Sequence, residues 1–92
     1  MTNSAFKKRT QKSRSNDTIN KILTATTDTI YEAGFHNTTT SRIALKAGVS
    51  RGALLHHFPR KEILIAEAVR FMLRKEIEEI ERLAENVKNH RL

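Results

Sequence analysis

The sequence predicts an all-α protein, with a three-helix bundle that contains a helix-turn-helix and a long fourth helix after it. Apolar residues recur at intervals of three and four, which is the spacing of one helix face. Glycine, proline and hydroxyl residues stand between these stretches, at the places where helices begin and end. No stretch shows the apolar–polar alternation of a strand or an Asn-Gly or Asp-Gly hairpin turn, so strands are not expected.

The N-terminal part divides into an arm and a first helix. Residues 1–16 are polar, carry five Lys and Arg and have no acid, so we expect a flexible basic arm. The side chains of Ser15, Asn16 and Asp17 can cap the start of a helix that ends at Gly34. Its predicted inner face consists of Ile19, Ile22, Leu23, Thr26, Ile30 and Ala33.

Two short helices and one long helix are predicted after Gly34. The threonines at 38–40 offer hydroxyl caps for a second helix, and a third helix runs from Ser50 until Pro59 interrupts it. Residues 17–62 are therefore the expected helix-turn-helix domain. Residues 63–92 predict a long amphipathic helix, either a dimerisation element or the start of a missing ligand-binding domain. Its apolar stripe consists of Ala66, Val69, Leu73, Ile77, Ile80, Ala84 and Val87, with Leu83 beside them.

The corner between the second and third helices is the most informative local pattern. Ala44 is small enough for the third helix to pack closely, and Gly48 tolerates the positive φ of a tight connection. Val49 can fill the inside of the corner, Ser50 can cap the third helix, and Leu54 can anchor it to the core. This arrangement is typical of a helix-turn-helix, whose second helix enters the major groove of DNA by its N-terminal end. An ordinary helical hairpin is the alternative.

Composition and charge narrow the function. The 92 residues include no cysteine, which excludes disulfides and Cys-based zinc sites, and no apolar run is long enough to span a bilayer. With no signal peptide recognised, we expect a cytoplasmic protein. Of the net charge of +7, residues 1–61 carry a balance of +8, from eleven Lys and Arg against three acids. Such a surface attracts polyanions such as nucleic acid, unless it serves solubility alone.

Catalysis, cofactors and metals find no support in the sequence. Asp28 and Glu32 share a helix face, but nothing near them completes an acid–base site. His56 and His57 are adjacent, and neighbouring helical residues point about 100° apart, so the two cannot easily chelate one ion. We therefore predict no enzyme activity, no cofactor and no metal.

Many positions agree in one register with a known family pattern: Gly34-Phe35, Thr38-Thr39, Ile43-Ala44, Ala47-Gly48-Val49-Ser50, Gly52, Leu54, His57-Phe58 and Lys61. In these residues the chain resembles the DNA-binding domain of TetR-type transcriptional regulators, from about Ile19 to Val69. The resemblance implies a homeodomain-like fold in a homodimeric regulator, commonly a repressor released by a small ligand, that reads a palindromic operator. Two positions depart from the family: it usually has an aromatic residue, often tyrosine, where Leu55 stands, and frequently threonine at Ala53.

The predicted partner is double-stranded DNA, bound by a homodimer formed through the C-terminal helix or a missing domain. No small-molecule effector is expected to bind this chain alone. The rival hypothesis is a helix-mediated protein interaction module whose basic surface is incidental. Candidates for base-edge contact are Arg51, Gly52, Ala53, Arg42 and Ser41. Candidates near phosphates are Thr38, Thr39, Thr40, Ser50, Leu55, His56, His57 and Lys61, with Lys7, Lys8 and Arg9 in the arm.

Overall fold

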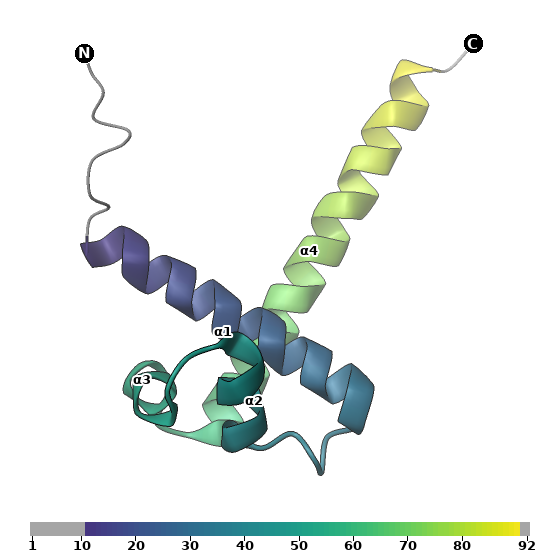
Figure 1. Cartoon of the computed structure of the whole chain (residues 1–92). Coiled ribbons are helices and arrows are strands. Elements are labelled where there is room, and N and C mark those ends of the chain that lie inside the picture. The colour runs from purple at the N-terminus through teal and green to yellow at the C-terminus, as the bar shows by residue number, and fades with distance from the viewer. Residues whose placement is uncertain (1–10, 91–92) are drawn as a thin grey trace, which may run out of the picture.

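The computed structural model describes residues 11–90, which form four helices and no strand (Figure 1). This confirms the predicted all-α class. The helices are α1 (Gln11–Ala33), α2 (Thr40–Ala47), α3 (Arg51–His57) and α4 (Lys61–Asn89).

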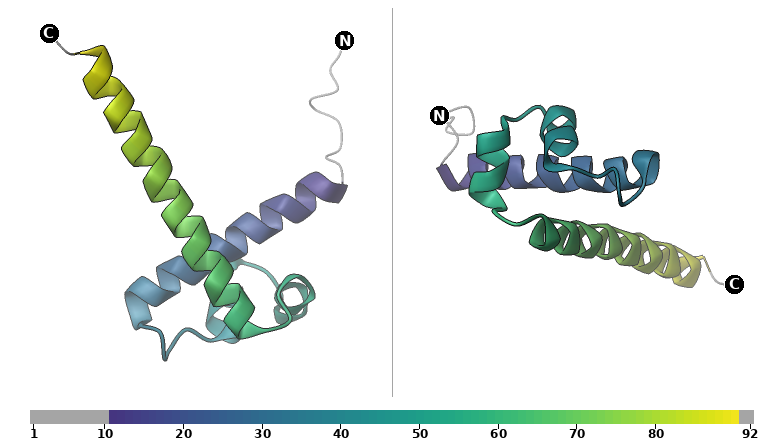
Figure 2. Two further views of the ribbon diagram at one scale, coloured as in Figure 1. Left: turned by 180° about the vertical axis from the view of Figure 1, so that it is seen from behind. Right: turned by 90° about the horizontal axis from the view of Figure 1, so that it is seen from below.

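The helices form a small bundle from which one long helix projects. α1 packs against both α2 and α4, and α2 packs against α3. α2 and α3 lie together at one end of the molecule, while the C-terminal part of α4 extends away from the other helices (Figures 1 and 2). The radius of gyration of 17.0 Å exceeds the roughly 12 Å expected for a compact domain of this length, because of this projection.

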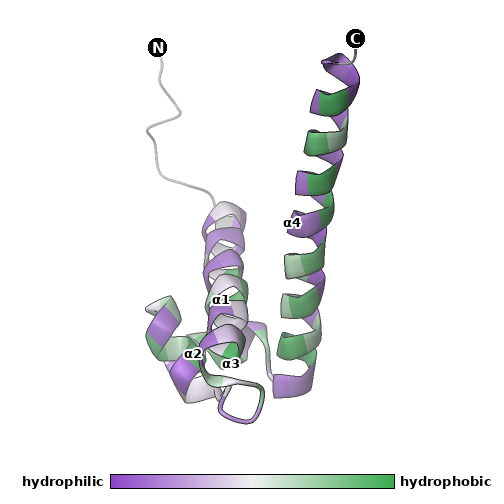
Figure 3. Cartoon of the chain, turned by 90° about the vertical axis from the view of Figure 1, so that its right-hand side faces the viewer, coloured by the Kyte–Doolittle hydropathy of each residue, from purple (hydrophilic) through white to green (hydrophobic). Residues whose placement is uncertain are grey.

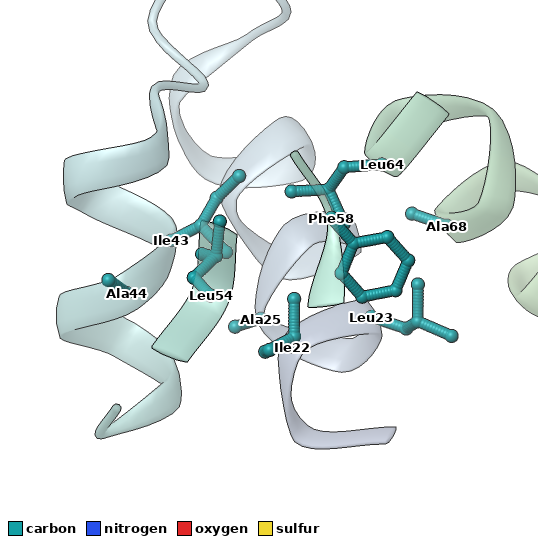
Figure 4. Close-up of a cluster of buried hydrophobic side chains, with 9 residues drawn as sticks. All are labelled: Ile22, Leu23, Ala25, Ile43, Ala44, Leu54, Phe58, Leu64 and Ala68. Atoms are coloured by element: carbon teal, nitrogen blue, oxygen red, sulfur yellow. The ribbon is translucent and has the colours of Figure 1, made fainter. Parts of the chain in front are cut away.

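The core lies where all four helices meet. α1 contributes Ile22, Leu23 and Ala25, and Phe58 follows the end of α3 (Figure 4). The largest fully buried apolar side chains are Ile22, Ile43, Leu54 and Leu64, so each of the four helices supplies one of them. The small residues Ala44 and Ala68 complete the cluster and let the backbones of α2 and α4 approach α1.

α1 begins earlier than the sequence predicts. Its first residue is Gln11, so residues 11–16 are helical and the expected caps at Ser15–Asp17 lie inside the helix. Gln, Lys and Arg in this stretch are good helix formers, and the Thr18 hydroxyl donates to the Arg14 carbonyl oxygen at 3.0 Å. Helix propensity and local hydrogen bonds therefore extend α1 beyond the residues that pack against the core. The arm residues Lys7, Lys8 and Arg9 lie outside the described residues.

Threonines in the middle of α1 are part of its buried face. The hydroxyls of Thr26 and Thr29 donate to the carbonyl oxygens of Ile22 and Ala25, each at 2.7 Å. Both side chains are buried, at 0% and 3% exposure, and these bonds satisfy the hydroxyls without a partner on another helix. Thr29 and Ala25 thus join a face that the apolar pattern alone did not assign to them.

α4 carries two apolar faces rather than one. Leu64 and Ala68 are buried against the bundle, and Phe71 packs beside them. At about 100° per residue, Leu73 lies about 140° around the helix from Ala68 and begins a separate stripe. The predicted single face was therefore wrong in its first turns, where Ala66 is exposed. The stripe continues towards the C-terminus as exposed Ile77, Ile80, Leu83 and Val87. In Figure 3, green segments recur along α4 almost to its C-terminal end. No helix in residues 11–90 is both long enough and apolar enough to cross a membrane.

Candidate nucleic-acid interface

The turn between α2 and α3 has the predicted geometry. Gly48 adopts a left-handed conformation, with φ of +73° and ψ of +31°. Its N–H donates to the Leu45 carbonyl oxygen at 3.2 Å, and the Val49 N–H donates to that of Ala44 at 3.1 Å. These bonds satisfy carbonyls at the end of α2, and the chain turns sharply into α3. Val49 is half-buried and packs against the core.

Hydroxyl side chains cap both helices of the motif. The Thr39 hydroxyl oxygen accepts from the Arg42 N–H at 3.2 Å, and the Ser50 hydroxyl oxygen accepts from the Ala53 N–H at 3.0 Å. Thr39 and Ser50 are exposed as well, so their hydroxyls remain close to solvent. The caps fix the direction of each helix N-terminus.

Thr38 lies inside the protein, unlike the other hydroxyl residues expected near phosphates. Its side chain is 0% exposed, and its hydroxyl donates to the Gly34 carbonyl oxygen at 2.7 Å. The hydroxyl closes the turn after α1, which is why it faces inward. In this conformation the Thr38 side chain is not accessible to a phosphate.

α3 has an inner face, an outer face and two flanks. Leu54 is fully buried, while Gly52 and His56, one turn apart on the far side, are exposed. Ala53 on one flank is half-buried, and Leu55 on the other is half-buried and packs against the core. The outermost line of the helix therefore begins with a residue that has no side chain.

Gly52 is not required by the backbone. The left-handed glycines among the described residues are Gly34 and Gly48. A Cβ added at Gly52 would meet nothing closer than the Ser50 hydroxyl oxygen at 3.9 Å, which is ordinary contact. Glycine within a helix costs about 0.5–1 kcal/mol relative to alanine. The fold thus gives no reason for glycine at this exposed position of α3.

Positive charge surrounds α3. Residues 38–61 contain five Lys and Arg and no Asp, Glu, Asn or Gln. Arg42 and Arg51 are exposed and Lys61 is half-buried, and none of the three has an ion-pair partner within residues 11–90. Lys46 pairs with Glu32 at 2.9 Å. A cationic surface of unpaired side chains is suited to phosphates.

The sequence pattern of the bacterial regulatory proteins of the tetR family matches residues 22–68, which include most of α1, all of α2 and α3, and the first turns of α4. The chain belongs to the TetR family. The family is one of bacterial regulatory proteins, and the relatives below carry the name of HTH-type transcriptional regulators, in agreement with the family that the sequence predicts for this chain.

The relatives of this TetR-family chain are regulators of transcription by name. It is 42% identical over 74 residues to the HTH-type transcriptional regulator RutR of Escherichia coli, covering 79% of the chain and 35% of RutR. It is 37% identical over 70 residues to the uncharacterized HTH-type transcriptional regulator Rv2912c of Mycobacterium tuberculosis, covering 76% and 36%. The chain thus spans about a third of the length of these relatives. No solved structure matches it.

The remaining candidates of the TetR-type domain lie around the same helices. Ser41 is exposed and Thr40 half-buried in the first turn of α2, and His57 is half-buried beside exposed His56 at the end of α3. The His56 and His57 ring centroids are 5.3 Å apart with their planes at 77°. Within residues 11–90, no three His, Asp or Glu residues gather as a metal site would require.

Arg60 is a basic residue that the sequence interpretation left out. It is exposed at the N-cap of α4, without a side-chain cap bond, and its Nε lies 3.8 Å from a Glu62 carboxylate oxygen. Its position directly before Lys61 was the available signal, since Arg60 is the N-cap and Lys61 the first residue of the helix that follows α3.

Proposed function

We propose that this chain is the DNA-reading part of a TetR-type repressor, which binds a palindromic operator as a homodimer with α3 in the major groove. The observation that carries the proposal is the outer face of α3. This face is flanked by unpaired cations and begins at a glycine that the fold does not require. A helix with that surface can bring its backbone close to base edges.

The proposed contacts follow from exposure and charge. Arg51, Gly52 and Ala53 in the first turn of α3 face base edges, with Arg42 and Ser41 of α2 beside them. Thr38 is omitted because its hydroxyl is buried, and Leu55 offers only van der Waals contact. Phosphates are contacted from Thr39, Thr40, Ser50, His56, His57 and Lys61.

The homodimer is proposed to form through the exposed stripe of α4. Leu73, Ile77 and Ile80 are 50–61% exposed and lie well away from the core-facing side of the helix. A second copy can therefore cover the stripe without disturbing α1–α3. A further domain covering the stripe is the other occupant that the sequence suggests, and the oligomeric state of this chain distinguishes the two.

Repression follows from where such a dimer binds. A regulator that occupies two neighbouring major grooves across a promoter excludes other proteins from the same DNA. We therefore expect a reporter gene placed behind the selected operator to be transcribed less when the chain is expressed. Higher transcription would make the protein an activator.

The operator itself tests the proposal. Selection from a pool of random duplexes should enrich two inverted half-sites whose centres are about 34–36 Å, or a multiple of that, apart. Affinity for the selected duplex should fall with salt, with log affinity changing by about −0.9 per neutralised phosphate for each unit of log salt. A single half-site would contradict the dimer, and an affinity independent of salt would contradict the proposed surface.

The exposed stripe also supports the rival function of a helix-mediated interaction module. That function predicts capture of a second helix by α4 with no dependence on Arg42, Arg51 or Lys61. Replacing these three residues by alanine should abolish duplex binding if the proposal holds, and should leave every activity unchanged if the basic surface is incidental.

A further inference from the structure

We infer that α3 selects bases by their hydrogen-bond acceptors and by the thymine methyl group, so that guanine and thymine specify the operator on whichever strand they stand. The inference rests on the proposed function, because it requires α3 to lie in the major groove. It assigns Arg51 and Ala53 as the residues that determine specificity.

The side chains of α3 include no amide, carboxylate or hydroxyl, which are the groups that can accept from the amino groups of adenine and cytosine, and the exposed Ser41 hydroxyl belongs to α2. Adenine is read by the amide of Asn or Gln, and the cytosine amino group by the carboxylate of Asp or Glu. Residues 38–61 contain none of these four residue types. The hydroxyl oxygens of Thr39 and Ser50 already accept the backbone N–H groups of their own caps. The two imidazoles stand in the last turn of α3, not in the turn that enters the groove.

Arg51 supplies the donors. It is the first residue of α3, exposed and without an ion-pair partner within residues 11–90. A guanidinium carries only donors, and its fork matches the N7 and O6 acceptors of guanine. Glycine at position 52 leaves the space beside it open, so the guanidinium can approach the base edge without competition from its neighbour.

Ala53 supplies the apolar contact. Its side chain is a single methyl group, half-buried on the flank of the first turn, and its backbone N–H is occupied by Ser50. It can offer a base only van der Waals contact, which the thymine C5-methyl group accepts and cytosine, lacking that methyl, does not. Threonine here would add a hydroxyl, so the alanine narrows the readout to the methyl group.

Base analogues in the selected operator test the inference with the unmodified chain. Replacing the key guanine by 7-deazaguanine removes N7 and leaves O6, so we expect to lose about half of the free energy of the bidentate contact, which is a loss of about 2- to 13-fold in affinity. Replacing the key thymine by uracil removes only the methyl group, and we expect a loss of about fourfold. A 5-methylcytosine at that thymine position should bind more tightly than cytosine, because it restores the methyl group.

Two variants link the losses to the assigned residues. Arg51→Gln provides an amide, so selection with this variant should replace the key guanine by adenine. Ala53→Gly should bind the thymine and uracil operators equally. Thermal unfolding of each variant, together with its salt-dependent binding to random duplex, shows that folding and phosphate contact are retained.

The outcomes separate this inference from the proposed function. Salt-dependent binding in which every guanine and thymine analogue stays within twofold of the natural operator would overturn the inference and leave the proposed function standing. Failure to bind any duplex would overturn both.

Discussion

The two ends of the molecule differ in what their apolar residues do. In the bundle of α1–α3 and the first turns of α4, a cluster of apolar side chains is buried, although Tyr31, Phe35, Leu45 and Ile63 are exposed, and the surface is basic. In the rest of α4 the apolar side chains are exposed, while residues 62–92 nearly balance their charges, with six Lys and Arg against seven Glu. The first region thus has a packed core and a positively charged surface, which attracts polyanions. The second has an exposed apolar stripe, which we propose that a second copy of the chain covers.

The largest expected effect is a difference in the free energy of unfolding between alanine variants of two leucines, one in the bundle and one at the end of α4. Leu54→Ala opens a cavity at a fully buried site and should lower the free energy of unfolding by about 2–5 kcal/mol. Leu83→Ala, at a side chain that is 54% exposed, should change it by less than about 0.5 kcal/mol. Urea unfolding at a concentration where the chain is monomeric measures both. Equal losses would mean that the end of α4 is packed as well as the bundle.

Introducing negative charge into the apolar stripe of α4 tests whether the stripe is the dimer interface. Ile77→Asp with Ile80→Asp should abolish self-association in sedimentation and lower operator affinity by about tenfold or more, because binding of the two half-sites is no longer coupled. The matched control is Asn86→Asp with Asn89→Asp, which adds the same charge on the other side of the helix. If both pairs behave alike, the stripe is not the dimer interface.

Substitution of Gly48, in the turn between α2 and α3, should have a smaller effect than the changes above. Gly48→Ala forces a residue with a Cβ into the left-handed conformation and should cost about 1–2 kcal/mol of unfolding free energy. Gly48→Asn should cost less, because asparagine tolerates that conformation better. Thermal or urea unfolding decides, and an unchanged Gly48→Ala variant would show that the turn can adopt another geometry.

The smallest effect is expected at the ion pair between α1 and α2. Glu32→Gln removes the partner of Lys46, and the pair is exposed, so stability should fall by no more than about 1 kcal/mol. The variant also frees a cation beside the motif, so affinity for random duplex should rise slightly at low salt. Unchanged affinity would place Lys46 outside the DNA surface.

Local chemistry made the fold predictable. Gly48, Thr39 and Ser50 are found where the sequence places a turn and two caps, because each role depends on neighbours within a few residues. The helix-turn-helix followed from that corner, DNA binding was supported by the charge, and the class of regulator followed from the family resemblance of residues 19–69. The inward position of Thr38 could not be predicted from the sequence. Its hydroxyl could cap α2 or donate to the Gly34 carbonyl oxygen, and the packing of the turn after α1 determines that it does the second.

Long-range packing accounts for the other differences. The period of α4 marks two apolar faces, and only contact with α1 selects Leu64 and Ala68 as the inner one. The first turns of α1, from Gln11, depend on helix propensity and not on burial. The sequence therefore has no apolar pattern there from which the start of the helix could be predicted. The open space around Gly52 likewise depends on where α3 lies against the bundle; the sequence already made Gly52 a candidate for base-edge contact, and the structure adds that the fold does not require glycine there.

Substitution of Gly52 tests most directly whether the outer face of α3 meets DNA, because there the needs of the fold and of the interface oppose each other. Gly52→Ala and Gly52→Leu should keep or raise the melting temperature, since the added atoms enter open space on a helix. Affinity for the selected operator should fall in the order Gly, Ala, Leu, by about tenfold or more for leucine, as the side chain holds the backbone away from the groove. Undiminished affinity in a folded Gly52→Leu variant would contradict the account.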